Sequence, residues 1–582
     1  MWPKLAIVLL FVVLLIASIP LLIRPEPLSD LLFHWTGETD ALPQVRGVFQ
    51  LASNWTRPQP VTADLVPVAH AGVNPFGINT FLEQEVEPAK RERQVQLISE
   101  AGFGWIRQAF PWEDIEIHGK DDFEDRRWQP HHSAWDKYDQ IVDLAEQYDL
   151  QIIALLKGSP LWARADQETR WTDAPPADYD DFGDYVYAVV SRYRGRVRYY
   201  QLWNEPNLGD EWGGVANAEE YVRLLRIGYR RAKEADPDCV ILSGALAATI
   251  ELDPRSPYGI NDFAFLQQMY DAGAADSFDI LSIQGYGLWS AAYDRRMRPR
   301  VLNFSRPLYV RGIMVRNGDA AKPIWISEMN WSAVPADFPD KRYGYVTPQQ
   351  QAHNVVDAYR RAQAEWPWMG VVNYWFFKRA TDAEKNQAWY YFRMAEPDFT
   401  LMPVYEAVKT YANQSPVMYP GYHQEDHWAI EYGGNWETRE DPDAVLGSYR
   451  LGQDETATLS FTFHGTDLWL QAGPGAGQQG TVLVTLDERS AQEHRWRAGE
   501  RVELARHLSD GPHQVTIRVH EGQLPVDGFI VQREPYWWLR WAVGLAAVVG
   551  LVGWLVRHFL RRRNSQESKV APAGQSTVNE VQ

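Results

Sequence analysis

Two glutamates stand near the ends of short apolar runs, and both have the chemistry for acid–base catalysis. Glu205 lies in QLWNEPNL and Glu328 lies in PIWISEMNW. If both runs are strands of one parallel barrel, their carboxyl ends open into a shared site. Two carboxyl groups there, one protonated and one ionised, suit cleavage of a glycosidic bond, and the ionised group would raise the pKa of the other. The alternative interpretation is a structural or solvated glutamate in each place, since Asn and Pro commonly form turns.

The chain between residues 71 and 415 predicts the elements that would position these carboxyl groups. Short apolar runs alternate there with longer amphipathic helical segments, a pattern typical of a (β/α)8 TIM barrel of the α/β class. A doubly wound sheet is the alternative, but no glycine-rich phosphate loop follows the first run. The predicted strands are FGINT (76–80), WIRQAF (105–110), QIIALLKGSP (151–160), VRYYQLWNEP (197–206), CVILSGAL (239–246), FDILSIQGYG (278–287), PIWISEMNW (323–331) and VVNYWFF (371–377).

The pattern changes after residue 415, where apolar and polar residues alternate and glycine-containing turns separate the runs. This alternation predicts an antiparallel β-sandwich over residues 416–534. The phrases FHGTDLWLQAG and VDGFIV resemble those of galactose-binding-like modules. Two roles stay open for this domain: it could bind carbohydrate, or it could act as a rigid spacer.

Both ends of the chain contain long apolar runs. Residues 5–23 hold nineteen positions without a charge, close to the ~20 that span a bilayer. We interpret them as an uncleaved anchor within residues 1–24, with a cleaved signal peptide as the alternative. Residues 541–556 form a second run, with aromatic residues before it and Arg561, Arg562 and Arg563 after it. This predicts a spacer at 25–70, a transmembrane helix within 535–560, and a tail at 561–582.

The predicted topology places both termini in the cytoplasm and the body of the chain outside the cell membrane, as a multi-pass protein with two helices. A formal charge of −19 argues against nucleic-acid partners, which need clustered Lys and Arg. The single cysteine, Cys239, excludes an internal disulfide and lies in an apolar run typical of a core. The histidines show no HExxH spacing, so we expect no metal and no cofactor.

Two motifs carry a resemblance to a known group of enzymes. LWNEPN (202–207) resembles the strand-four motif of clan A glycoside hydrolases, and IWISEMN (324–330) resembles their strand-seven motif. Together with WIRQAFPWEDIE (105–116) and LLKGSPLWA (155–163), they are similar to family 39 members, including membrane-associated endoglycosidases of bacterial exopolysaccharide operons. The resemblance covers residues 71–415. It implies a retaining O-glycosyl hydrolase (EC 3.2.1.-) acting on a polysaccharide or oligosaccharide, with Glu205 as general acid/base and Glu328 as nucleophile.

The resemblance also implies substrate-binding residues. Asn204 would bond the hydroxyl beside the anomeric centre, Arg107 would position Glu328, Tyr286 would lie near the nucleophile, and Trp375 would stack beneath the sugar at the cleavage site. Gln284 departs from the pattern, because many members have a histidine there. The alternatives are that Arg107 pairs with a carboxylate such as Glu113, and that the two aromatic residues only pack. Four more tryptophans are candidates either for further sugar subsites or for the core: Trp162, Trp212, Trp289 and Trp331.

Two other functions stay open at this point. One is an exopolysaccharide assembly or export factor with incidental hydrolysis, partnered by a polysaccharide synthase, which attachment at both ends of the chain would favour. The other is a non-catalytic glycan-binding membrane protein, against which the presence of both Glu205 and Glu328 argues. The high content of Trp and Tyr, 26 and 28 residues, suits stacking on sugar rings along an extended chain, or packing in the core.

Overall fold

A computed structural model describes residues 26–536, other than 39, 55, 165–172, 254, 255, 257, 299 and 476, together with residue 553. The two predicted membrane segments, 5–23 and 541–556, lie outside these residues apart from residue 553. Within the described ranges, no helix combines the length and apolarity that a bilayer crossing requires.

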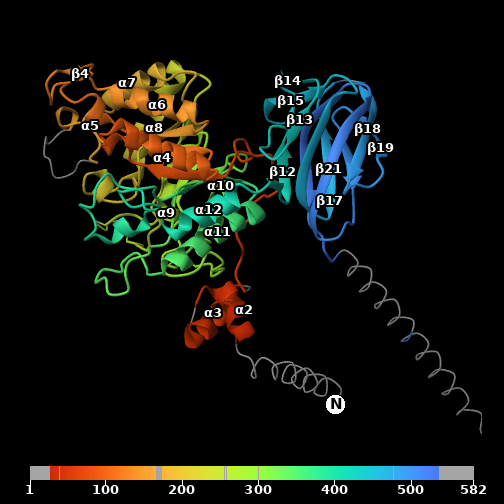
Figure 1. Cartoon of the computed structure of the whole chain (residues 1–582), viewed down its shortest axis with the longest axis horizontal. Coiled ribbons are helices and arrows are strands. Elements are labelled where there is room, and N and C mark those ends of the chain that lie inside the picture. Colours follow the sequence, from red (N-terminus) through yellow and green to blue (C-terminus); the bar gives the residue numbers. More distant parts are fainter. Residues whose placement is uncertain are drawn as a thin grey trace, which may run out of the picture.

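The first large domain is a closed parallel barrel, and the helices on its outside are labelled in Figure 1. Its eight strands are hydrogen-bonded in the order β7-β6-β5-β2-β1-β10-β9-β8. Parallel bridges from Leu242 to Ile280 and from Leu246 to Ile283 join β7 to β8 and close the circle. The predicted TIM barrel is therefore confirmed, and the doubly wound sheet is excluded. The strands are β1 (Phe76–Thr80), β2 (Trp105–Pro111), β5 (Gln151–Lys157), β6 (Tyr199–Leu202), β7 (Val240–Leu242), β8 (Leu281–Gln284), β9 (Ile324–Met329) and β10 (Met369–Tyr374).

A helix follows each of these strands and covers the outside of the barrel. The helices are α4 (Pro88–Glu100), α6 (Asp136–Gln147), α7 (Tyr179–Arg192), α8 (Ala218–Ala235), α9 (Asp262–Asp271), α10 (Pro307–Arg316), α11 (Pro348–Glu365) and α12 (Pro403–Ala412). Short elements lie in the connections: α5 (Trp112–Ile115), β3 (Glu124–Asp125), β4 (His132–Ser133) and the 3-10 helices η1 (Leu82–Gln84), η2 (Leu161–Ala163), η3 (Asp210–Trp212), η4 (Ala275–Ser277) and η5 (Ala388–Phe392).

The inside of the barrel is apolar near the amino ends of the strands. Trp105 of β2 meets Trp325 of β9 with ring centroids 5.1 Å apart, and Tyr199 of β6 stacks on Trp325 at 5.2 Å. Two residues further along each strand, side chains return to the same face. Those positions hold polar residues. The barrel interior therefore has an aromatic plug of Trp105, Tyr199 and Trp325 and a polar layer above it.

The second domain is a β-sandwich of two sheets, as the alternation after residue 415 predicts. Its strands pair antiparallel except β11 and β16, which are parallel. One sheet has the order β11-β16-β21-β18-β19 with β13 beside β16, and the other has the order β14-β15-β22-β17-β20 with β12 beside β22. The strands are β11 (Val417–Met418), β12 (Gly421–Gln424), β13 (Glu431–Gly433), β14 (Trp436–Glu440), β15 (Ser448–Gly452), β16 (Thr458–Gly465), β17 (Asp467–Ala472), β18 (Gln479–Leu486), β19 (Gln492–Arg497), β20 (Arg501–Ala505), β21 (Gly511–Glu521) and β22 (Leu524–Gln532), with η6 (Val445–Gly447) before β15.

The segment expected as a spacer, residues 25–70, contains two helices, α2 (Glu26–Thr36) and α3 (Ala41–Asn54). Both are drawn in red below the barrel in Figure 1. Further along this segment, Thr62 and His70 bind the barrel through their carbonyl oxygens, which accept hydrogen bonds from Arg311 Nε at 2.9 Å and from Trp325 Nε1 at 3.0 Å. The segment predicted as a spacer therefore contains helices and is hydrogen-bonded to the barrel.

Candidate active site

The floor of the site is a polar layer just above the aromatic plug of the barrel. Arg107 is 3% exposed and lies two residues beyond Trp105 on β2. Its Nε donates to Gln201 Oε1 at 2.8 Å, and its Nη1 donates to Asn79 Oδ1 at 2.7 Å. Gln201 and Ser327 also lie two residues beyond plug aromatics, and Ser327 Oγ donates to Gln201 Oε1 at 3.0 Å. This network fixes the guanidinium before any ligand arrives.

Glu328 is the buried carboxylate of the site. Arg107 Nη1 donates to its Oε1 at 3.2 Å, and Tyr286 Oη donates to its Oε2 at 2.7 Å. Each carboxylate oxygen therefore accepts a hydrogen bond, one of them from a cation, and both donors hold the carboxylate in one orientation. Burial, followed by the charge of Glu328, raises the pKa of Tyr286 well above its ordinary value, so the phenol stays a donor. Arg107 contacts Glu328 directly, whereas no hydrogen bond joins it to Glu113 among the described contacts.

Glu205 lies three residues beyond the end of β6, so it belongs to the loop after the strand. The backbone reaches it through left-handed conformations, with φ of 74° at Trp203 and 43° at Glu205. Such values are costly for residues with side chains and are tolerated where the surroundings enforce them. Here the Glu205 amide donates to the Ala245 carbonyl at 2.9 Å, and Asn207 Nδ2 donates to the Ala247 carbonyl at 2.9 Å. The motif is thus anchored to the chain beyond β7.

The surroundings of Glu205 favour its protonated form. Burial raises the pKa of this carboxyl from 4.5 to about 8, and the negative charges of Glu328 and Glu211 contribute. Its Oε1 accepts a hydrogen bond from the neutral amide of Gln284 at 2.9 Å, which opposes the rise. The ammonium of Lys157 also opposes it, but Lys157 is held by Asp173 at 2.9 Å and by Glu211 at 3.2 Å.

Residues at the end of β8 bring the two glutamates together. Gln284 binds Glu205, and Tyr286, two residues later, binds Glu328. Asn204, next to Glu205 in the chain, accepts a hydrogen bond through its Oδ1 from Arg107 Nη2 at 2.8 Å. Both carboxyl groups therefore belong to one connected network at the carboxyl ends of the strands, where TIM-barrel sites form.

A cavity of about 230 Å³ opens at this network. Trp375 lines it, with its ring edge-to-face against Phe81 at 5.6 Å, and the peptide bond after Trp375 is cis. Other lining residues are Asn79, Thr80, Glu83, Gln84, Arg107, Ala109, Pro111, Glu113, Leu155, Lys157, Gly158, Asn204 and Glu328.

The four candidate tryptophans differ in their surroundings. Trp212 and Trp331 are buried in the core, at 3% and 0% exposure. Trp162 is half-buried, donates through Nε1 to the Glu116 carbonyl at 2.8 Å and packs against Trp112, and it is not among the residues that line the cavity. Trp289 is 62% exposed and lines a different pocket.

Sequence reasoning missed several residues of this site. Asn79, Gln201 and Lys157 each contact a group that the motifs did identify, or line the cavity with it. A signal was present for Gln201, because a polar residue inside an apolar strand, two positions after the inward Tyr199, is placed on the inner face. Among the described residues, no group of three or more His, Cys, Asp and Glu side chains has the arrangement of a metal site.

Similar folds occur among solved structures. No family model matches the sequence, and no curated protein matches it. A family 39 glycoside hydrolase from Bacteroides cellulosilyticus is 18% identical, with a TM-score of 0.44 over 78% of this chain and 83% of that one. A glucosidase from Croceicoccus marinus is 12% identical, with a TM-score of 0.44 over 79% and 100%. A β-xylosidase from Caulobacter crescentus is 14% identical, with a TM-score of 0.40 over 80% and 98%. These likenesses are distant, so a functional conclusion has to come from the site itself.

Proposed function

We propose that this chain is a retaining O-glycosyl hydrolase that cleaves a polysaccharide or oligosaccharide. The observation that carries the proposal is the pair of glutamates at one barrel mouth in opposite surroundings. A guanidinium and a phenol donate to Glu328, whereas burial favours a protonated Glu205 with its pKa raised to about 8. A carboxylic acid beside a carboxylate is the pair that glycosidic cleavage uses.

The first half of the reaction would form a covalent intermediate. Glu328 attacks the anomeric carbon, and Glu205 gives its proton to the glycosidic oxygen as that bond breaks. The leaving sugar departs with the proton, and a glycosyl ester on Glu328 remains. Arg107 and Tyr286 hold the attacking carboxylate in one orientation before the sugar binds, which reduces the ordering required in the transition state.

The second half would return the enzyme to its starting state. Glu205, now ionised, takes a proton from water, and the resulting oxygen nucleophile attacks the anomeric carbon from the face that the leaving group vacated. The ester bond to Glu328 breaks, and two inversions give net retention. Asn204 would donate from its amide to the neighbouring sugar hydroxyl, because its Oδ1 already accepts from Arg107. Trp375 would supply an apolar face at the cavity wall.

We also propose that the enzyme is held at a cell membrane with its barrel outside. The apolar runs at 5–23 and 541–556 support this, and so does the surface of α2 and α3. Leu42, Val45 and Phe49 of α3 are 83%, 51% and 72% exposed, and their spacing places them on one helical face. Leu31 and Trp35 of α2 are also exposed. A helix pair with a bare apolar face, three residues after a membrane-length run, suits the lipid interface.

The test uses the full-length chain in mild detergent with a panel of 4-nitrophenyl glycosides and soluble polysaccharides. We expect at least one substrate to be cleaved, and Glu328→Gln to lower kcat by at least about 10⁴-fold because the nucleophile is lost. Glu205→Gln should lower kcat by about 10² to 10⁴-fold on polysaccharide, the usual range for a general acid. Full activity in either variant would exclude the assigned chemistry.

Azide separates the two roles on the activated aryl substrate. In Glu205→Ala, azide should attack the glycosyl ester and yield a glycosyl azide of retained configuration. In Glu328→Ala, azide should attack the sugar directly and yield the inverted azide. Nuclear magnetic resonance of the product reads the configuration. Inverted azide from Glu205→Ala would show that the two glutamates have the opposite roles.

A further inference from the structure

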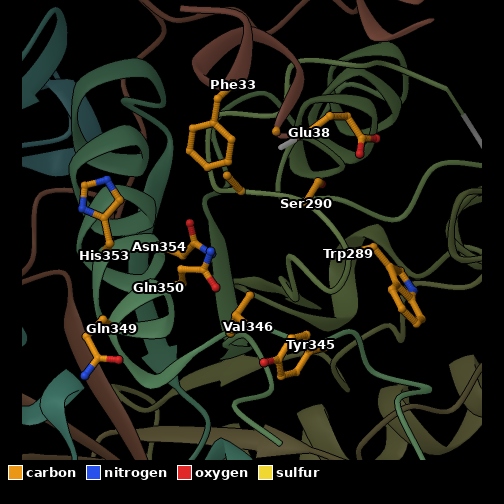
Figure 2. A pocket seen from close by; sticks show the side chains of 12 residues that line it. Phe33, Glu38, Trp289, Ser290, Tyr345, Val346, Gln349, Gln350, His353 and Asn354 are labelled. Atoms are coloured by element: carbon orange, nitrogen blue, oxygen red, sulfur yellow. The ribbon is translucent and has the colours of Figure 1, made fainter. Parts of the chain in front are cut away.

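A second pocket lies on the flank of the barrel, between α2 with the residues that follow it and α11 (Figure 2). Its volume is about 600 Å³, within the range of about 300–1,000 Å³ usual for ligand sites. In Figure 2, Gln350 and Asn354 lie between Phe33 of α2 and Tyr345 of the loop after β9. The remaining lining residues are Gly37, Glu38, Trp289, Ser290, Ala291, Val346, Gln349 and His353.

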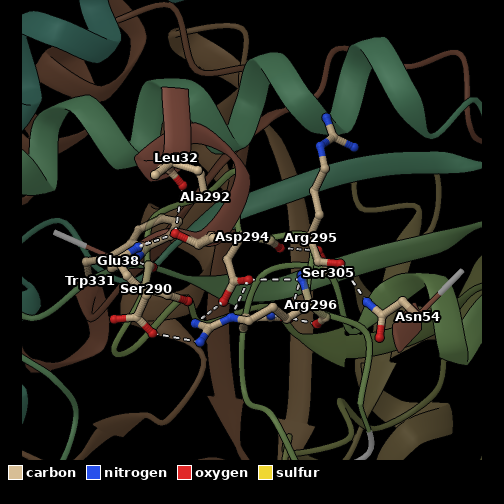
Figure 3. Close-up of polar contacts among 12 residues, drawn as sticks. Leu32, Glu38, Asn54, Ser290, Ala292, Asp294, Arg295, Arg296, Ser305 and Trp331 are labelled. Carbon is tan, nitrogen blue, oxygen red and sulfur yellow. Dashed lines mark hydrogen bonds and ion pairs between the residues drawn. The ribbon is translucent and has the colours of Figure 1, made fainter. Parts of the chain in front are cut away.

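The walls of this flank pocket are fixed to one another (Figure 3). Glu38, just after α2, pairs with Arg296 Nη1 at 2.6 Å, and Arg296 Nη2 pairs with the fully buried Asp294 at 2.6 Å. Arg361 of α11 donates to the Ala292 carbonyl at 2.6 Å. Gly37 lies so close to the loop after β8 that a Cβ added to it would come within 2.9 Å of Ser290 Cβ. The pocket is therefore preformed, and the amino-terminal segment completes it.

Two exposed aromatic residues lie at the end of the pocket away from Phe33, on two loops that touch each other (Figure 2). A Cβ added to Gly344 would lie 2.2 Å from the Leu288 carbonyl oxygen and 3.4 Å from the Trp289 nitrogen, so the loops after β8 and β9 touch there. Trp289 and Tyr345, which follow these two contact points, are 62% and 41% exposed. Exposed Trp and Tyr with apolar faces and polar edges are suited to stacking on sugar rings.

Three amide side chains line the flank pocket, Gln349, Gln350 and Asn354, and its one acidic residue, Glu38, is paired with Arg296. Asn354 is only 6% exposed, and its side chain makes no hydrogen bond to any residue in the described part of the chain. Its amide atoms are not among the fully enclosed polar atoms that lack a partner, so they are accessible from the pocket and can bond a ligand there. The Oε1 of Gln350 accepts a hydrogen bond from the Thr347 amide at 2.8 Å and so caps α11. The NH₂ group of Gln350 takes no part in this cap. None of the lining residues is Lys or Arg, so the pocket does not suit a polyanion.

The aromatic end of the pocket is close to the catalytic centre along both loops. Trp289 is three residues after Tyr286, which binds Glu328, and three residues span at most about 11 Å. Tyr345 is two residues after Tyr343, whose ring lies 5.8 Å from that of Phe392, and Phe392 lies 5.4 Å from Tyr286. A polymer bound at the cavity can therefore reach the flank pocket within a few sugar units.

We infer that the flank pocket is a secondary binding site for a neutral glycan, which holds a distal segment of the polymer whose bond is cleaved at the barrel mouth. This inference rests on the proposed hydrolase function for the identity of the polymer. Trp289 and Tyr345 stack on sugar rings, and Asn354 and Gln350 donate to sugar hydroxyls. The amino-terminal segment, which we propose lies at the membrane, thereby also contributes to substrate binding.

The test measures polymer binding without turnover. The full-length chain carrying Glu328→Gln is run in native affinity gels that contain soluble xylan, galactomannan, mixed-linkage β-glucan or alginate. We expect retardation by at least one neutral polymer, with Trp289→Ala and Tyr345→Ala each weakening the Kd about tenfold, and Asn354→Ala about fivefold. Tyr187→Ala is the matched control, since Tyr187 is 39% exposed on α7, and should leave the Kd unchanged.

Three results would overturn the inference: no retardation by any neutral polymer, retardation by alginate alone, or an unchanged Kd in the variant that combines Trp289→Ala with Tyr345→Ala. Thermal unfolding of each variant checks that the fold persists. We expect it to persist, because the Trp289 and Tyr345 side chains are exposed. In the active background, the ratio of kcat/KM on polymer to that on an aryl glycoside should fall about tenfold for Trp289→Ala. Because gel binding needs no turnover, polymer binding through Trp289 without any cleavage would remove the hydrolase proposal alone.

Discussion

Glu205 and Glu328 are the same residue type at the same end of one barrel, yet their neighbours differ in charge. Glu328 accepts hydrogen bonds from a guanidinium and a phenol. Glu205 accepts one from a neutral amide, and burial and the charges of Glu328 and Glu211 outweigh the effect of Lys157 on its pKa. The side chain alone therefore does not decide which glutamate is the acid. The neighbours on β2 and β8 decide it, and they are the residues to change.

The largest effect is expected where the cation beside Glu328 is altered. Arg107→Lys keeps one positive charge but loses the planar fork that binds Glu328, Asn204, Asn79 and Gln201 together. We expect kcat/KM to fall by about 10² to 10³-fold, in line with the loss of a positioned charged hydrogen bond. Steady-state kinetics on the best aryl substrate measure it.

Arg311→Lys is the matched control for this substitution. Arg311 is fully buried and also binds through a fork, but its partners are the carbonyls of Thr62, Ala320 and Lys322 outside the site. It should lower the melting temperature and leave kcat/KM per folded molecule unchanged. Equal losses of activity in both variants would mean that Arg107 acts through the fold and not through Glu328.

A smaller effect is expected on the free energy of unfolding. At pH 9 its sign should differ between Glu205→Gln and Glu328→Gln. The pKa of Glu205 is raised from 4.5 to about 8, so the folded state binds this proton more tightly than the unfolded state does. The stability from this group is complete below about pH 4 and is lost as the pH rises through about 8. Glu205→Gln should therefore stabilise the fold at pH 9, by at most about 5 kcal/mol, and have little effect at pH 4.

Glu328→Gln should destabilise the fold at pH 9, because Arg107 would lose its carboxylate partner while it stays buried. Chemical denaturation of both variants and the parent at pH 4 and pH 9 measures the difference. Stabilisation by Glu328→Gln at pH 9, or destabilisation by Glu205→Gln there, would contradict the contrast drawn between the two sites.

The barrel and the location of both glutamates could be predicted from the sequence because local patterns determine them. Apolar strands such as IWISEM and VVNY, with amphipathic helices between them, specify the parallel barrel. The position of Glu205 was predicted only approximately, since β6 ends at Leu202 and the left-handed backbone at Trp203 and Glu205 depends on contacts with Ala245. Those contacts join segments forty residues apart, and no local pattern reports them.

The amino-terminal segment was harder to predict for the same reason. Its helices are short and its contacts are distant in sequence, as the pair formed by Glu38 and Arg296 shows. Trp289 could be named as a candidate for sugar binding, but its exposure depends on the packing of the loop after β8 against the loop after β9. Side-chain exposure follows from tertiary packing, and residue type alone does not determine it.

The smallest expected effect is on the pH dependence, and it tests the neutral partner of Glu205. The first step needs Glu205 protonated, so kcat/KM should fall about tenfold per pH unit above about pH 8. The hydrogen bond from Gln284 lowers the pKa of Glu205, so Gln284→Met should move this alkaline limb upward by about half a unit. Gln351→Met is the control, because Gln351 is equally buried but binds Asn330 and Trp331 instead. A downward shift in Gln284→Met, or an equal shift in the control, would show that the limb belongs to another group, since removing a donor to a carboxylate can only favour its protonated form.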